Sequence, residues 1–256
     1  MKRRDFIQGS LLATASSLIV VPSSTATPTI DSDLPLLTEG KETIFATESG
    51  LYGQDNLFVL GYLLVDALQI ETIEVQIKQY RASLKYTAKL TYRSNDENKQ
   101  EIVKQLITSF AKNPAMRFCA KVLKTETPEE DQNINETSIS FGKKSLKKID
   151  FYKSLNEQIS ATNPKFIVKS QSAFGPSVFF KDKFAESIKS TEMEAVNTMS
   201  SELVQFSGIL TGCVRAAIAQ NTKNKTKLLI VEHLQQVLGY KSIEIGTGNE
   251  KFRIFQ

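Results

Sequence analysis

The chain has 256 residues, of which 41% are hydrophobic and 23% charged, and its formal net charge is +4 at pH 7. These are ordinary proportions for a globular protein, and they exclude collagen-like and wholly disordered chains. With only 2 cysteines the chain is not a disulfide scaffold, and the small net charge gives no argument for a nucleic-acid partner.

The N-terminus has the features of an export signal. Arg3 and Arg4 precede Phe6, and a moderately apolar run at 9–21 leads to small residues around Ala26. That run is shorter than the ~20 residues needed to span a bilayer. The opening resembles a twin-arginine signal; an ordinary Sec signal and a disordered basic arm are the alternatives. We therefore expect cleavage after Ala26, the twin-arginine translocation machinery as a partner, no membrane span after cleavage, and a periplasmic or secreted bacterial protein.

The mature chain is predicted to start with a linker and a β-hairpin. The signal covers 1–26, and the linker at 27–41 contains proline and threonine. Strand-forming residues at 42–47 and 57–65 flank a turn with two glycines at 48–56. The two strands should therefore pair as a hairpin.

Helices and strands alternate after the hairpin. Apolar residues recur at helical spacing between Leu68 and Leu84, which predicts an amphipathic helix. The acidic stretch at 125–135 is expected to be an exposed loop. The remaining predicted elements are a strand at 86–92, a helix at 96–112, a strand at 116–123, a helix at 143–160, a strand at 165–170, a helix at 180–189, a strand at 192–197, and helices at 201–219 and 223–238.

This alternation predicts a single α/β domain over 42–240, built on a mixed β-sheet flanked by helices. The tail at 241–256 contains Gly246 and Gly248, and we expect it to close as a hairpin or to stay loose.

Three segments resemble a bacterial family known as domain of unknown function 3800. They are the hairpin segments 44–50 and 58–65, the segment 83–86 (Ser-Leu-Lys-Tyr), and the late helix segment 204–212 (Val-Gln-Phe-Ser-Gly-Ile-Leu-Thr-Gly). The resemblance implies a ribonuclease H-like fold. It also implies that acidic residues from a central strand, a nearby element and a late helix converge on divalent metal ions.

The family's acidic positions are not acidic in this chain. They carry Thr47, Ser83 and Gly208, and Glu48 is the one carboxylate that remains from the matched motifs. Mg²⁺ is a hard ion that takes oxygen ligands, and a pair of such ions needs several negative charges around it. We therefore predict no catalytic residue and no metal at this degenerate site. Its matched positions are Thr47, Glu48, Ser83, Lys85, Gln205 and Gly208.

Our leading hypothesis is thus an exported, catalytically degenerate domain with a binding or interaction role. The enzyme alternative is a phosphodiester hydrolase that depends on Mg²⁺ or Mn²⁺, in which the alignment shifts by one residue. Glu48 would then be a ligand, and Glu202 or Asp55 would supply others. A structural envelope protein with an unrelated α/β fold is the third hypothesis.

Other chemistry-bearing residues have ordinary explanations. His233 lacks the partners of a zinc site, so we expect a core or surface imidazole. Cys119 and Cys213 either pair or remain as two buried thiols. Gly208 and Gly212 lie four residues apart on an apolar helix, which favours close packing over a ligand pocket.

A lysine cluster offers a possible phosphate-binding stripe. A solvated lysine face is favoured over nucleic-acid binding, because few arginines and aromatics interleave with it. The cluster consists of Lys143, Lys144, Lys147, Lys148 and Lys153.

Overall fold

The computed structural model describes residues 42–50, 57–92, 97–124, 152–159, 165–169, 192–196, 200–219 and 224–256. Six strands form one sheet in the order β5-β4-β1-β2-β3-β6. The strands are β1 (Glu42–Ser49), β2 (Leu57–Asp66), β3 (Met116–Lys124), β4 (Lys165–Lys169), β5 (Glu192–Val196) and β6 (Phe252–Phe255). The sheet is mixed. The β1–β2 and β2–β3 pairs are antiparallel, whereas the β1–β4, β4–β5 and β3–β6 pairs are parallel.

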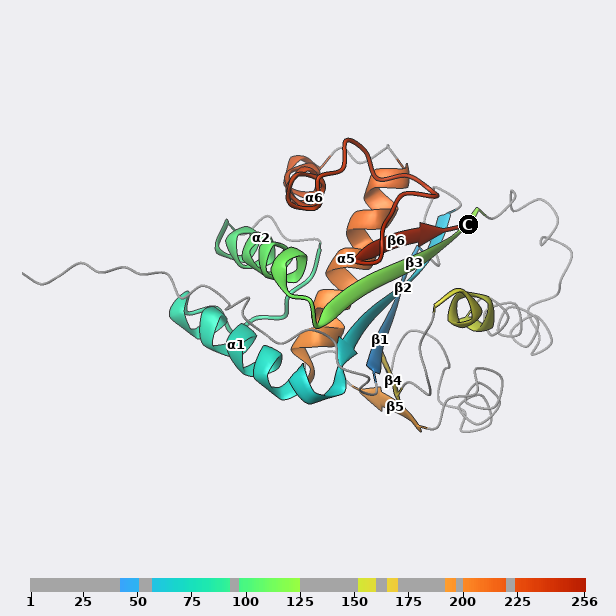
Figure 1. The fold of residues 1–256 in the computed structure, drawn as a ribbon. Helices are drawn as coiled ribbons and strands as arrows, with labels where there is room; N and C mark the ends of the chain where they lie inside the picture. Colours follow the sequence, from blue (N-terminus) through green and yellow to red (C-terminus); the bar gives the residue numbers. More distant parts are fainter. Residues whose placement is uncertain are drawn as a thin grey trace, which may run out of the picture.

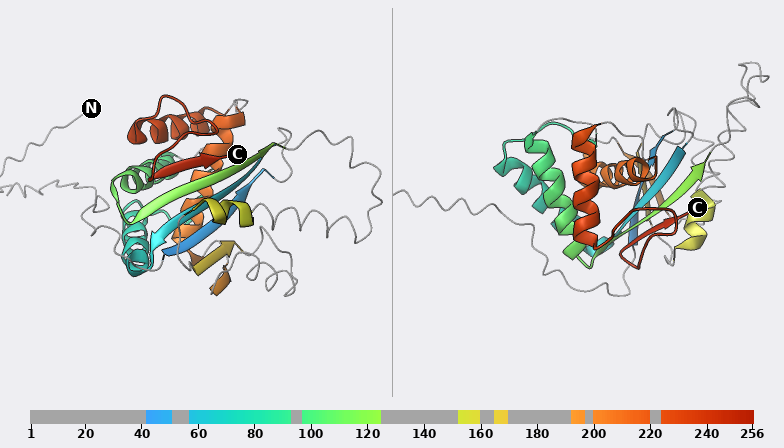
Figure 2. Two further views of the ribbon diagram at one scale, coloured as in Figure 1. Left: turned by 45° about the vertical axis from the view of Figure 1, so that its right-hand side comes forward. Right: turned by 90° about the horizontal axis from the view of Figure 1, so that it is seen from above.

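Helices cover both faces of this sheet. The named helices are the short 3₁₀ helix η1 (Ala67–Gln69), α1 (Ile70–Ser83), α2 (Glu97–Lys112), α5 (Glu202–Ala219) and α6 (Lys225–Leu238). Figures 1 and 2 show α1, α2, α5 and α6 on one face of the sheet, and the yellow helical segment 152–158 on the other. All ten residues of β2 are buried, as expected for a central strand covered on both sides. The predicted α/β class with a mixed sheet flanked by helices is confirmed.

The side chains of β1 alternate between two hydrophobic clusters. Phe45 packs into the large cluster that contains the buried residues of α5, whereas Ile44 and Ala46 pack with Tyr152 in a smaller one. Since side chains point to opposite faces at successive strand positions, Thr47 belongs to the face of Phe45. Glu48, the next residue along the strand, belongs to the opposite face.

Helix α5 is the centre of the larger layer. It is the one described helix long and apolar enough to cross a membrane by length and composition, yet 72% of it is buried inside the fold. It packs against β1 and β2 on one side and against α6 on the other. It is therefore the core helix of this layer.

The C-terminal tail is part of the sheet, which corrects the expected domain end at residue 240. Strand β6 pairs in parallel with β3, and the ring of Phe252 stacks on that of Phe118 with centroids 5.4 Å apart. The Lys251 ammonium also donates to the carbonyls of Asn113 and Met116. Burial of Phe252 at 0% exposure helps to hold this segment in place.

The expected strand at 86–92 is also wrong, because this segment is irregular. Its backbone groups are bonded by side chains of neighbouring helices and not by a strand: Arg81 donates to Ala88, and Leu90 donates to Gln205. The predicted helix at 143–160 is described only from 152. The predicted helix at 180–189 and the loop at 125–135 lie outside the described residues.

The buried Lys251 predicts that stability depends on pH. Burial lowers the pKa of Lys251 to about 7, whereas a lysine in the unfolded chain titrates near pH ~10. Between these values the unfolded state binds more protons, so the free energy of unfolding should rise with pH, by at most ~1.4 kcal/mol per pH unit. Urea unfolding from pH 6 to 9.5 should show this rise in the wild type and a smaller one in Lys251→Met. Parallel curves for the two proteins would contradict it.

Candidate functional site at the junction of β1 and α5

Three buried hydroxyl groups join β1 to α5 at the position where the sequence resemblance implies a metal site. Thr47 Oγ1 on β1 lies 2.8 Å from Thr211 Oγ1 and 3.0 Å from Ser207 Oγ, both on α5. Ser207 donates to the carbonyl of Phe45 at 2.7 Å, and Thr211 donates to the carbonyl of Ser207 at 2.8 Å. The three residues are at most 2% exposed. We call them the hydroxyl cluster.

A count of protons fixes the direction of these hydrogen bonds. Each hydroxyl has a single proton to donate. Ser207 and Thr211 give theirs to backbone carbonyls, so the one proton of Thr47 goes to either Thr211 Oγ1 or Ser207 Oγ at a time. The hydroxyl cluster therefore satisfies its donors internally and carries no charge.

Gly61 on β2 allows α5 to lie this close to the sheet. A Cβ atom built at Gly61 would lie only 2.0 Å from Thr211 Oγ1 and 2.9 Å from the ring of Phe118. Any larger residue would push α5 away from β2 and separate the hydroxyl cluster. This glycine falls in the second hairpin segment of the sequence resemblance, and its role here is close approach.

Gly208 lies beside Thr47, at an opening in the buried surface of α5. It is the only residue between 201 and 214 that is not buried. A Cβ atom at this position would have one neighbour within 4 Å, the Thr47 Cγ2 methyl at 4.0 Å. The close-packing explanation therefore does not fit Gly208. It does fit Gly212, where a Cβ would lie 2.9–3.0 Å from atoms of Tyr92.

Glu48 lies on the opposite face of the sheet from the hydroxyl cluster. Its carboxylate is half-buried, and its Oε1 accepts a hydrogen bond of 2.8 Å from Tyr152 in the helical segment 152–158. Burial raises the pKa of Tyr152, and the negative charge of Glu48 raises it further. The remaining carboxylate of the matched motifs therefore bonds to a residue on the other face of the sheet and does not face Gly208.

Ser83 and Lys85 lie at the end of α1. The Ser83 hydroxyl is exposed and donates to the carbonyl of Tyr80 at 2.7 Å; no described hydrogen bond joins it to Thr47 or Gly208. Lys85 is exposed and has a positive φ of 53°, where helices usually place glycine. The amides of Lys85 and Tyr86 donate to the carbonyls of Ala82 and Arg81, which closes the helix as a Schellman motif.

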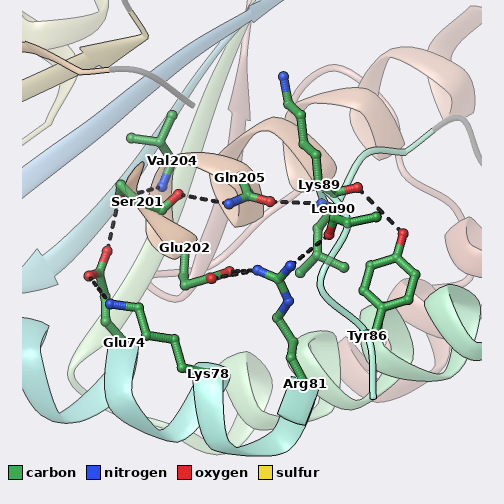
Figure 3. A network of polar contacts seen from close by, with 11 residues as sticks. Glu74, Lys78, Arg81, Tyr86, Lys89, Leu90, Ser201, Glu202, Val204 and Gln205 are labelled. Atoms are coloured by element: carbon green, nitrogen blue, oxygen red, sulfur yellow. Dashed lines mark hydrogen bonds and ion pairs between the residues drawn. The ribbon is translucent and has the colours of Figure 1, made fainter. Parts of the chain in front are cut away.

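Gln205 and Glu202 belong to a buried polar network that joins α1 to α5 (Figure 3). Both carboxylate oxygens of Glu202 lie 2.5 Å from Arg81 Nη1, and both side chains are 8% exposed. Gln205 accepts from the amide of Leu90 at 2.7 Å. Glu202, a ligand in the shifted alignment, is thus engaged with Arg81, and its partner in that alignment, Asp55, lies outside the described residues.

The residues at this junction do not fit a divalent metal ion. Within the described parts of the chain, no group of three or more His, Cys, Asp or Glu side chains is placed to hold a metal. The polar side chains of the hydroxyl cluster are neutral. Their hydroxyl protons already form hydrogen bonds with a neighbouring hydroxyl oxygen or with backbone carbonyls. Among the described residues, no group of carboxylates is placed there to offset the charge of a pair of Mg²⁺ ions.

The remaining candidates take structural positions. Cys119 and Cys213 are free, and they lie in hydrophobic clusters on opposite faces of the sheet. His233 on α6 lies with its Nε2 3.1 Å from the carbonyl of Lys104 on α2. This contact requires a proton on Nε2, since a carbonyl only accepts. Lys153 is exposed, and the other four lysines of the cluster lie outside the described residues.

Sequence reasoning missed Ser207, Thr211 and Arg81. The first two are small polar residues four positions apart on an otherwise apolar helix, a spacing that puts both on one face. That signal was available, because a buried helix admits polar residues only with partners. Arg81 lies on the helical face of Ile77 and Tyr80, and nothing in the sequence singled out Glu202 as its partner.

Comparisons with known proteins found a likeness among solved structures but no family. No family model matches the chain, and no curated protein matches it. Among solved structures, the chain is similar to the crystal structure of the ribonuclease H2 from Pyrococcus horikoshii OT3, with 15% identity, coverage of 76% of each chain and a TM-score of 0.42.

The two glycines of α5 should respond in opposite ways to alanine. Gly208→Ala adds a methyl that meets only the Thr47 methyl, and it should raise the free energy of unfolding by about 0.5–1 kcal/mol through helix propensity. Gly212→Ala adds a methyl group that would clash with the Cβ and Cγ atoms of Tyr92, and rotation of that side chain does not move its Cβ away. It should lower stability by about 1–3 kcal/mol. Urea unfolding of both variants is the measurement, and a loss of stability in both would contradict the open position of Gly208.

Proposed function

We propose that this chain is an exported ribonuclease H-like domain that lacks a metal centre and acts as a binding or interaction module. The observation that carries the proposal is the hydroxyl cluster. It occupies the junction of a central strand and a late helix, which is where the resemblance to domain of unknown function 3800 implies metal-bound carboxylates. Thr47 and Gly208 lie side by side there, so both matched positions fall at one point.

The electrostatics of the junction support a role without metal. Two divalent ions repel each other strongly in a protein interior, and only several nearby carboxylates offset that repulsion. The described carboxylates closest in sequence to the matched positions are engaged elsewhere: Glu48 with Tyr152, and Glu202 with Arg81. Moving either toward Gly208 would break a buried contact and leave Arg81 or Tyr152 without it.

Metal titration tests this proposal against the hydrolase alternative. Calorimetric titration of residues 27–256 with Mg²⁺ and Mn²⁺ should show no saturable binding, and labelled DNA and RNA should not be cut in an EDTA-sensitive manner. The Glu48→Gln variant should behave like the wild type in both assays. Micromolar binding that disappears in Glu48→Gln, together with metal-dependent cleavage, would establish the hydrolase instead.

Export through the twin-arginine route can be tested by a charge-conserving substitution. The double variant Arg3→Lys, Arg4→Lys keeps the basic character that a Sec signal requires but removes the paired guanidinium groups. We expect the wild type to appear in the envelope fraction cut after Ala26, and the double variant to remain as an intact precursor. Mass spectrometry of the fractions measures both, and Lys2→Arg is the matched control. Normal processing of the double variant would favour the Sec route.

A further inference from the structure

The segment between α1 and α2 lies across α5 without any secondary structure of its own. We call residues 87–92 the strap. No backbone–backbone hydrogen bond is described for residues 87–92, whereas the helices and strands on either side have regular ladders. Polar side chains of three helices bond the strap instead, and Tyr92 of the strap also contacts α6, since its hydroxyl donates to the carbonyl of Lys227 at 3.4 Å and the Lys227 ammonium lies 5.5 Å from the centre of its ring.

Each anchor is a buried polar side chain (Figure 3). Arg81 of α1 donates to the carbonyl of Ala88 at 2.6 Å, and Gln205 of α5 accepts from the amide of Leu90 at 2.7 Å. Lys99 of α2, which is 4% exposed, donates to the hydroxyl of Thr91 at 2.7 Å. Figure 3 shows the first two anchors side by side. Glu202 is bonded to the other terminal nitrogen, Nη1, of the Arg81 guanidinium group.

Apolar contact of the strap with α5 rests on two residues. Leu90 is 1% exposed, and the Tyr92 side chain packs directly on Gly212, where no Cβ would fit. Cys213, which follows Gly212, is close to the same ring: burial raises the pKa of Tyr92, and the nearby Cys213 adds to that rise. The strap therefore covers the part of α5 that carries Gly212 and Cys213.

The strap follows a turn at Lys85 and Tyr86 that is suited to a hinge. Lys85 is the only described residue other than glycine with a positive φ, so the chain there already leaves the preferred backbone region. The Schellman motif closes α1 at Lys85 and Tyr86, so α1 does not need the strap to complete its last turn.

We propose that the strap opens as a unit beyond the turn at Lys85 and Tyr86 while α1, α2, α5 and the sheet stay folded, and that opening uncovers the Gly212–Cys213 face of α5. A segment held by side-chain hydrogen bonds and two apolar residues detaches at lower free energy than a paired strand. The device adds access control to α5, and it rests on the contacts of the strap alone, so it stands whether or not the binding role proposed above is correct.

Hydrogen exchange tests the opening directly. In the full chain the Leu90 amide should exchange at least about tenfold faster than amides of β2 such as that of Leu63. Tyr92→Ala removes the ring from Gly212 and should speed Leu90 exchange at least about tenfold further, with β2 unchanged. Tyr240→Ala is the matched control, because Tyr240 is also a partly buried tyrosine but packs on Phe252, away from the strap.

Thiol labelling gives a second measurement that does not depend on amide exchange. In a Cys119→Ala background, Cys213 is the single thiol and is 0% exposed in the closed form. Its labelling under native conditions should be faster in Tyr92→Ala than in Tyr240→Ala. The proposal is overturned if Leu90 exchanges only through global unfolding, at the protection of β2. It is equally overturned if both tyrosine variants speed exchange and labelling to the same extent, because the effect would then be a general loss of stability.

Discussion

The close packing of α5 on the sheet is the constraint on which the described fold depends. Thr47, Ser207 and Thr211 form hydrogen bonds within the core, and Gly61 has no side chain to prevent their approach. Each such bond contributes only about 0.5–1.5 kcal/mol net, but a buried polar group left unbonded costs about as much or more. The cluster therefore specifies position more than it adds stability. It also fixes the register of β1, since a slip by one residue would point Glu48 at α5 and bury a charge there.

Negative charge near the sheet is held in closed pairs, away from the junction of β1 and α5. Glu42 at the start of β1 accepts two hydrogen bonds from Arg117, at 2.8 and 2.5 Å, in a bidentate pair. Glu48 at its other end accepts from Tyr152, and Glu202 is bonded to Arg81. Truncating one partner of the buried Glu202–Arg81 pair costs about 3–5 kcal/mol, so Glu202 is held where it is. The uncharged hydroxyl cluster and the engaged carboxylates are thus two aspects of one arrangement.

Local sequence signals predicted most elements because hydrophobic period and turn residues act over short distances. The hairpin, α1, α2, β3 and α5 could all be predicted from the period of their apolar residues. The segment 86–92 could not, since its alternating pattern is that of a strand, while its hydrogen-bond partners, Arg81 and Gln205, come from other elements. The tail does fold back on itself as one of the two expectations had it, but the pairing of β6 with β3 could not be predicted, because Phe252 gains its burial from Phe118, which is distant in sequence. At the site, the sequence alone shows that positions 47 and 208 carry no carboxylate. It could not predict the partners of Thr47, since Ser207 and Thr211 lie 160 or more positions away.

Strand β6 also bears on the proposed export route. The sheet edge at β3 is covered only when residues 252–255 have been added, and Lys251 bonds the end of α2 and the start of β3 at the same time. An uncovered β3 edge would expose backbone donors and acceptors beside the buried ring of Phe118, which is a hazard for aggregation. The domain therefore completes its fold only once the C-terminal segment is present. A route that accepts folded proteins, as proposed above, therefore suits such a chain.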